Sequence, residues 1–403
     1  MCDSHIIFFP VEHINTDAVP NHVWPGIRHQ TVNHFGEVFS GRGQIWDGVS
    51  PLTGGQFKIR PEFKHNPNQP AQLIGYEVSI NTPACVVGNN ALMDNLVYLS
   101  LVASRDLLHY NLLHLGCDPR LVKKILLKRA ELRSVTLTYL VPFDDFEQAT
   151  SANAAMEDIS ESHINARQPE HSIEAPAKSV TSRGSTSVEM KFGRKYEITS
   201  YVKKGRTKFS YNRFANQQVE RAIFAESSRH LRVEIMLKTT YLKNHKDEEG
   251  NKRDITDPEA WRNGKASRLY EEGFLIIRRE LGLDGNLRLR RPQPSHMAKL
   301  SQTEREVATQ HFAGNDYRGH ERFANRTKQY ASKVKRSIER KLKIDMSVPW
   351  RKSHKSTALL SKHLIWRGAF TPPDHLANHC FVRSTVSERL SQLKAEIEKL
   401  AQR

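Results

Sequence analysis

The chain has 403 residues, of which 38% are hydrophobic, and its 61 Lys and Arg against 44 Asp and Glu give a formal net charge of +17 at pH 7. This length allows two or three domains, and so large a positive charge favours a polyanionic partner, with nucleic acid ahead of an acidic membrane surface. The longest apolar stretch is broken by Arg105 and Asp106. A membrane-spanning helix is therefore not expected.

The first residues, MCDSHIIFFPVEH, lack the basic leader and small-residue cleavage site of a secretory signal. We therefore expect a cytoplasmic protein, in the cytoplasm of a bacterial host. The four cysteines, at positions 2, 85, 117 and 380, show no CxxC pair and no zinc-like spacing with histidine. Reduced thiols without a structural metal are the expectation.

The first 145 residues predict a sheet, then helices, then a further strand. QFKIR and LIGYEVSIN alternate as strands, with apolar residues of the second at 74, 76, 78 and 80. Residues 91–115 carry apolar positions at helical spacing, and DPRLVKKILLKRA opens with an Asp cap and a Pro, as a second helix would. ELRSVTLTYLV is rich in β-branched residues at period two, which predicts a strand.

The middle of the chain predicts a polar connection followed by more strands. Residues 148–187 are rich in Ser, Ala, Glu and Asn, which favours a linker or surface excursion with room for one short helix. TSVEMKFG, YEITSYVKK and HLRVEIMLKTTYL then alternate as strands, and FANQQVERAIFAESS between the last two is compatible with a helix.

The last hundred residues are basic and mostly helical in pattern. Residues 318–355 hold 13 Lys or Arg against 3 Asp or Glu, which makes them a candidate phosphate-contacting surface. The final 18 residues carry Leu390, Leu393, Ile397 and Leu400 at a three-and-four spacing over only two heptads. A terminal helix docked on its own domain is therefore favoured over a coiled coil.

These elements predict an α+β fold, an antiparallel sheet with helices packed on one side, plus a mostly helical basic C-terminal region. The predicted divisions are 1–147 for the N-terminal part of the main domain, 148–187 for the linker, 188–290 for the strands and helices that complete the domain, and 291–403 for the C-terminal region.

The strand around Tyr201 carries the first candidate catalytic residues. Alternation places Tyr201 and Lys203 on one face, about 7 Å apart at the backbone. A phenol is a weak nucleophile at neutral pH unless a cation stabilises the phenolate, and Lys203 could supply that charge or stabilise a departing oxygen. The alternative is an ordinary solvated strand face.

The strand RVEIMLK offers a partner for this pair. Its apolar residues at 233, 235 and 237 leave Arg232, Glu234 and Lys238 on the opposite face. Glu234 could ligate Mg²⁺, which takes oxygen ligands and typically one or two carboxylates. A cross-strand ion pair is the alternative role, and spacing does not separate the two.

Four segments in this order resemble the phage/plasmid replication protein gene II/gene X family, the replication initiators of filamentous phages. They are YEVSINTPACVVGNNALMDNL, ELRSVTLTYLV, YEITSYVKK and HLRVEIMLKTTYLK, and the likeness spans roughly residues 55–245. The resemblance implies an endonuclease that nicks one strand of double-stranded origin DNA with the help of a divalent cation. It also implies rolling-circle replication, in which host polymerase and helicase extend and displace a single strand.

Residue roles follow from the same resemblance. The family's Tyr-x-Lys nucleophile motif matches Tyr201 and Lys203, which implies a 5′-phosphotyrosyl intermediate. Arg232 and Lys238 match positions expected to hold DNA phosphates, and the neighbouring Lys204 is a further DNA-binding candidate. Glu234 matches the position expected to bind the divalent cation.

The chain departs from the family pattern at one acidic position, which Thr136 occupies. Glu131 or Glu77 are the candidate substitutes as a metal ligand, and Tyr211 in KFSYNRF is the rival nucleophile. Two other functions stay open from the residues themselves. One is a basic DNA- or RNA-binding protein without catalysis, and the other is a metal-dependent nuclease that activates water.

Overall fold

The computed structural model describes residues 2–402 except 12–29, 33–37, 43–44, 65–71, 168–186, 204–216, 248, 263, 282, 284–291, 316–319, 324–325, 343, 345 and 347–358. The fold is α+β, as predicted. In a ten-stranded antiparallel sheet, nine strands have the order β2-β3-β5-β6-β1-β7-β10-β9-β8. The tenth strand, β4, pairs with the first part of β5, and β3 pairs with its last part.

The strands of this sheet are β1 (Cys2–Pro10), β2 (Gln30–Val32), β3 (Val38–Arg42), β4 (Trp46–Val49), β5 (Gln56–Lys64), β6 (Gln72–Asn81), β7 (Glu131–Pro142), β8 (Ser187–Phe192), β9 (Tyr196–Val202) and β10 (His230–Lys238). A separate small hairpin pairs β11 (His245–Lys246) with β12 (Lys252–Arg253). The α-helices are α1 (Thr82–Val87), α2 (Val97–His114), α3 (Pro119–Val122), α4 (Phe146–Arg167), α5 (Gln217–Ser228), α6 (Thr239–Lys243), α7 (Gly264–Glu280), α8 (Pro294–Met297), α9 (Gln302–Phe312), α10 (Lys328–Leu342) and α12 (Arg383–Ala401).

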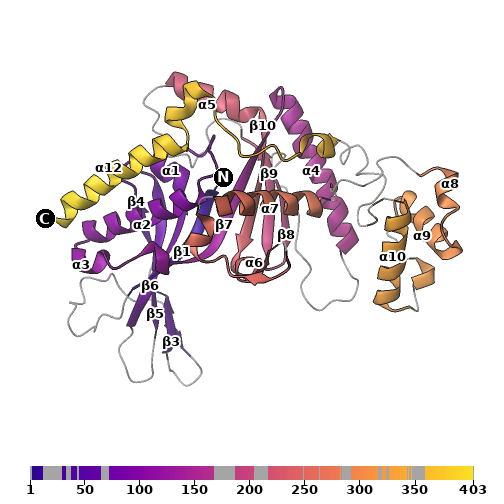
Figure 1. Cartoon of the computed structure of the whole chain (residues 1–403), viewed down its shortest axis with the longest axis horizontal. Helices are drawn as coiled ribbons and strands as arrows, with labels where there is room; N and C mark the ends of the chain where they lie inside the picture. The colour runs from indigo at the N-terminus through magenta and orange to yellow at the C-terminus, as the bar shows by residue number, and fades with distance from the viewer. Residues whose placement is uncertain are drawn as a thin grey trace.

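The two faces of the sheet differ in chemistry because side chains alternate along each strand. On β10, Val233, Ile235 and Leu237 are buried on one face, as the sequence predicts. Three long helices, α2, α4 and α7, contact this apolar face (Figure 1). The opposite face of β10 carries Arg232 and Glu234, and the register aligns them with Tyr201 and Thr199 of β9. We call it the polar face.

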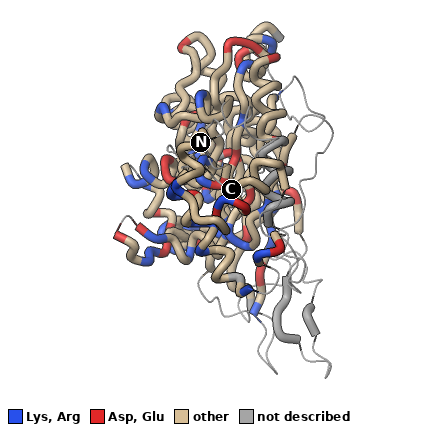
Figure 2. Tube along the Cα trace, turned by 90° about the vertical axis from the view of Figure 1, so that its right-hand side faces the viewer, with Lys and Arg blue, Asp and Glu red and all other residues tan. Residues whose placement is uncertain are grey.

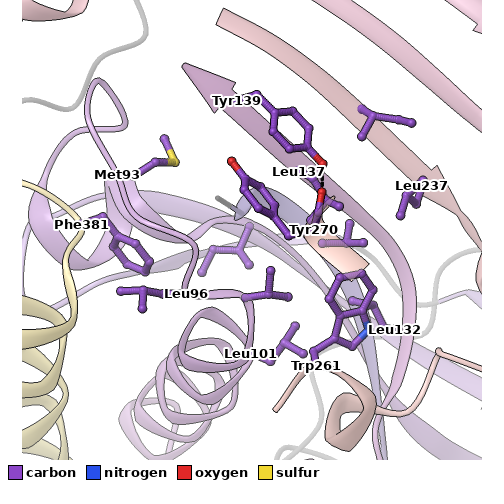
Figure 3. Close-up of a cluster of buried hydrophobic side chains, with 14 of the residues drawn as sticks. Met93, Leu96, Leu101, Leu132, Leu137, Tyr139, Leu237, Trp261, Tyr270 and Phe381 are labelled. Carbon is purple, nitrogen blue, oxygen red and sulfur yellow. Dashed lines mark hydrogen bonds between the residues drawn. The ribbon is translucent and has the colours of Figure 1, made fainter. Parts of the chain in front are cut away.

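The helix α7 approaches the sheet closely at Gly273. Tyr139 of β7 donates a hydrogen bond from its hydroxyl to the Tyr270 carbonyl oxygen at 2.6 Å, and the two rings stack with centroids 4.4 Å apart. Figure 3 shows this pair among buried apolar side chains of the core. A Cβ atom at Gly273 would lie 2.4 Å from the Tyr139 hydroxyl and 3.0 Å from a Leu137 methyl group. The absence of a side chain at 273 therefore permits this packing.

Replacing Gly273 with alanine should lower the free energy of unfolding by about 1–3 kcal/mol, because overpacking outweighs the gain in helix propensity. Urea denaturation measures the change. Gly264→Ala on the same helix is the control, since a Cβ there meets no heavy atom within 4 Å. Equal unfolding midpoints for the two variants would show that α7 does not pack this closely.

Part of the C-terminal region forms a helical unit with its own core. Helices α8, α9 and α10 lie together, away from the sheet (Figure 1). Buried residues from these helices and the segments beside them form a cluster distinct from the main core: Leu300, Val307, Ala308, Phe312, Phe323, Val334, Ile338, Leu342, Ile344 and Met346. The later helix α12 returns to the main domain, where it packs on α2 and α1. Residues of the predicted C-terminal region 291–403 thus contribute to two hydrophobic cores.

The strand predicted over HLRVEIMLKTTYL ends at Lys238, because Thr239–Lys243 form the short helix α6. Two further predicted segments differ from the structure. The proposed linker at 148–187 begins inside α4, whose small Ala149 and Ala152 are buried against the sheet and let the helix lie close to it. The second helix predicted from 118 ends at Val122, although Asp118 caps it as expected. Ile125 and Leu127, two residues apart, are both buried, which one face of a regular helix cannot achieve.

Among the described residues, no helix is long and apolar enough to cross a membrane.

Candidate functional site

Tyr201 lies at the end of β9 on the polar face, directly opposite Arg232 of β10. Its ring is half-buried, and its hydroxyl donates a hydrogen bond to Glu234 Oε1 at 2.9 Å. Glu234 is two residues after Arg232 and therefore on the same face of β10. The alternation of β9 and β10 thus brings a phenol and a carboxylate into contact, as the sequence pattern allowed.

Arg232 is the centre of the site and is only 1% exposed. Its Nε donates to Glu234 Oε1 at 2.6 Å, and its Nη2 lies 3.3 Å from Asp3 Oδ2. Its Nη1 donates to the Asn90 carbonyl oxygen, and the guanidinium carbon lies 5.6 Å from the centre of the Tyr201 ring. Burial opposes the charge of Arg232, but Tyr201 and the two carboxylates hold its pKa above the ordinary value. The cation between Asp3 and Glu234 is thus a side chain of the protein.

Lys203 joins the same cluster from the residue after β9. Its Nζ donates to Asn90 Oδ1, and Asn90 Nδ2 donates to Asp3 Oδ1 at 2.8 Å. Burial, together with the nearby charge of Arg232, lowers the pKa of Lys203 to about 7. This amine therefore divides between its charged and neutral forms at neutral pH.

Burial also sets the protonation of the phenol and the carboxylate. It raises the pKa of Tyr201 well above its usual value, although Arg232 acts in the opposite direction. It raises the pKa of Glu234 too, again against the effect of Arg232. A phenol in this environment is not ionised before it reacts, so a nucleophilic role needs a base in contact with it. The Glu234 carboxylate, at 2.9 Å, is placed for that task.

The carboxylates near Tyr201 do not form an evident ligand set for Mg²⁺. No group of three or more His, Cys, Asp or Glu suited to a metal ion occurs within the described ranges. Glu234 and Asp3 both pair with Arg232, so a metal ion would have to displace the guanidinium. Thr136, at the position where the family resemblance implies an acid, is buried and accepts a hydrogen bond from Ser4 at 3.1 Å. The carboxylates around Tyr201 therefore do not fit a divalent cation as the structure arranges them.

Two other candidates, Glu77 and Lys238, lie in a different part of the polar face. β6, which carries Glu77, is three strands from β10, a separation of about 14 Å. Lys238 is six residues beyond Arg232 on β10, which is about 20 Å along the strand. Both line a groove of about 660 Å³. The structure therefore does not place Glu77 where it could share a ligand with Glu234.

The contacts of these residues also differ from the predicted roles. Glu77 pairs with Arg60 at 2.9 Å and with Arg133, and Lys238 pairs with Glu197 of β9. Glu131, the other candidate metal ligand, pairs with Lys243 at 2.7 Å. Each of these carboxylates thus has a cationic side chain as its partner.

The DNA-binding candidate Lys204 and the rival nucleophile Tyr211 lie outside the described residues.

Sequence reasoning missed two members of the site, Asp3 and Asn90. Asp3 belongs to the first strand and is two strands from β10, and Asn90 follows the short helix α1. Neither is near Tyr201 in the chain, and no periodicity links them to it. The one local signal is the polar pair Asn89-Asn90 between two apolar segments, a pattern typical of an ordinary turn.

Comparisons with known proteins add no family to this description: no family model matches the chain, and neither the curated proteins nor the solved structures show a significant similarity to it.

Proposed function

We propose that the protein is a site-specific nicking and rejoining enzyme that initiates rolling-circle replication of phage or plasmid DNA through a covalent bond to Tyr201. The observation that carries the proposal is the contact between the Tyr201 hydroxyl and Glu234, beside the guanidinium of Arg232. Lys203 belongs to the same cluster of charges, through its interactions with Arg232, Asp3 and Glu234. A phenol, an acceptor for its proton and cations for a phosphate are the groups that such a transfer requires.

In the cleavage step, Tyr201 Oη attacks the phosphorus of one DNA strand, and the phenolic proton moves to Glu234 Oε1. The new bond joins phosphorus to Tyr201 Oη, and the bond from phosphorus to the 3′-oxygen breaks. The protonated amine of Lys203 gives its proton to the departing oxygen, which leaves as a 3′-hydroxyl. Arg232 stabilises the negative charge that develops on the phosphoryl oxygens.

The covalent bond keeps the free energy of the broken linkage. A later 3′-hydroxyl can attack the 5′-phosphotyrosyl bond and restore a continuous strand, with the two proton transfers reversed. The first 3′-hydroxyl meanwhile serves as the primer for a host polymerase, while a helicase separates the displaced strand. Double-stranded origin DNA, the displaced single strand and the host replication enzymes are therefore the proposed partners, in a bacterial cytoplasm.

The decisive experiment is to isolate the covalent intermediate. The full chain is incubated, with Mg²⁺ in the buffer, with supercoiled DNA of the replicon that encodes it, and complexes that survive denaturing detergent are collected. After nuclease and protease digestion, mass spectrometry should find a nucleotide on the peptide that contains Tyr201. Nicked DNA without any bound protein would instead support a nuclease that uses water, and binding without nicking would support a non-catalytic protein.

The pKa of Lys203 predicts the pH dependence of the nicking rate. Because its pKa is lowered to about 7, the fraction of charged amine halves at that pH and falls about tenfold for each further pH unit. A step that needs the charged amine should therefore slow above pH 7. Lys203→Arg, which stays charged over this range, should remove the alkaline decline even if its maximal rate is lower. A wild-type nicking rate that is constant from pH 7 to pH 9 would show that the charged amine of Lys203 does not take part in the step.

A further inference from the structure

The helix α10 carries a stripe of polar and cationic side chains on one face. Gln329, Lys333, Arg336 and Arg340 follow one another at spacings of four, three and four residues, so they share a face of the helix. All four are exposed. The buried residues Val334, Ile338 and Leu342 lie on the other side of the helix, against the core of the helical unit. The stripe therefore lies on the side of α10 opposite this core, where its four residues line an open hollow of about 710 Å³.

The charges on this helix are not equivalent. Lys341 pairs with Glu304 at 2.7 Å, and Lys335 lies 3.5 Å from Glu339. The three cations of the stripe have no ion pair within the described part of the chain. Internal ion pairs thus form beside the stripe and leave its own three cations without one in the described part of the chain. Figure 2 marks the positions of Lys and Arg along the backbone, seen from this end of the molecule.

We infer that the stripe of α10 is a docking surface for duplex DNA, separate from the site around Tyr201. The choice of DNA as the polyanion rests on the proposed function. The helix has 15 residues and is therefore about 22 Å long, and an α-helix fits the major groove of B-form DNA. Arginine and lysine can contact phosphates or guanine, and Gln329 at the start of the stripe can contact adenine.

The helical unit that carries the stripe has a hydrophobic core of its own. Because α8, α9 and α10 pack around their own buried residues, the unit can bind a duplex without rearranging the sheet that holds Tyr201. A nicking enzyme needs two actions: it must hold a duplex at a defined place, and it must present one strand for cleavage. We assign the first action to α10 and the second to the polar face of β9 and β10.

The test uses the full chain with Lys333, Arg336 and Arg340 all replaced by glutamine. Binding to a mixed-sequence duplex of about 30 base pairs is measured over a range of salt concentrations. We expect at least a tenfold loss of affinity near physiological salt. The slope of log affinity against log salt should fall by about two to three units, because each lost phosphate contact removes about 0.9.

The matched control removes three exposed cations from the later part of the chain, through Lys362→Gln, Arg383→Gln and Lys394→Gln. It changes the net charge equally and should keep wild-type affinity and slope. Wild-type binding by the α10 variant, or equal losses in both variants, would overturn the inference. So would a duplex RNA of the same length that binds as tightly as the DNA and loses as much affinity in the α10 variant.

A second readout separates this inference from the proposed function. The α10 variant should still form the covalent adduct on single-stranded DNA that contains the cleavage site, because the residues around Tyr201 are unchanged. If no chain forms an adduct while the α10 variant alone loses duplex binding, the proposed function fails and the docking surface stands. If the adduct forms normally and duplex binding is unchanged in the α10 variant, the proposed function stands and the docking surface fails.

Discussion

Replacing Tyr201 with phenylalanine should abolish the covalent protein–DNA adduct and reduce nicking by a factor on the order of 10⁴ to 10⁶, the range of loss when a covalent catalytic group is removed. The substitution deletes only the hydroxyl. Glu234 keeps its hydrogen bond from Arg232, so the fold should persist. Binding to duplex DNA should stay within about twofold of wild type. Detergent-resistant adducts and nicked circles, resolved on denaturing gels, measure the effect.

Tyr196→Phe is the matched control for this substitution. Tyr196 lies on the same strand but on the opposite face, where its hydroxyl donates to Glu280 at 2.7 Å. Its loss should cost about 1 kcal/mol of stability and leave the adduct intact. If Tyr201→Phe nicks DNA at the wild-type rate, the nucleophile lies elsewhere, and Tyr211→Phe becomes the variant to examine.

Replacing Arg232 with methionine should lower the free energy of unfolding by about 3–5 kcal/mol, which is a large part of the stability of an ordinary domain. Methionine fills much of the same volume, so packing is largely kept. The loss comes from two carboxylates, Asp3 and Glu234, that stay in a buried site without their cation. Urea denaturation measures the change, and nicking should fall with it because Arg232 faces the Tyr201 ring.

Two controls show whether charge causes this loss. Arg229→Met removes an exposed arginine that lies 3.5 Å from Glu226, and it should cost less than about 1 kcal/mol. The deficit of Arg232→Met relative to wild type should also shrink as pH falls from 7 to 5. Glu234, whose pKa is raised by burial, then binds a proton in the folded variant, and uptake of a proton by the folded state raises stability as pH falls. A deficit that does not change with pH would point to lost packing.

Much of the fold follows from local patterns in the sequence. Period-two alternation in LIGYEVSIN, ELRSVTLTYLV, YEITSYVKK and HLRVEIMLKTTYL indicated which residues share a face, and it predicted that Tyr201, Arg232 and Glu234 all avoid the apolar side. The apolar spacing of residues 91–115 predicted the helix that the structure has at Val97–His114. These predictions succeed because alternation and helical periodicity are properties of neighbouring residues, and burial of the apolar face then selects the same arrangement. The composition of residues 148–167 predicted a linker, but this segment belongs to the helix α4, whose buried alanines pack against the sheet.

The site itself depends on the tertiary structure. The order of strands in the sheet decided that β1 lies two strands from β10, which brings Asp3 to Arg232, and that β6 lies three strands away, which separates Glu77 from Glu234. No local pattern encodes strand order, because it is set by which surfaces bury best together in the whole molecule. The sequence by itself determined a basic α+β protein with a tyrosine and a lysine on one strand face. Only the tertiary structure decided that an arginine between two carboxylates, and a buried amine held by Asn90, surround that tyrosine.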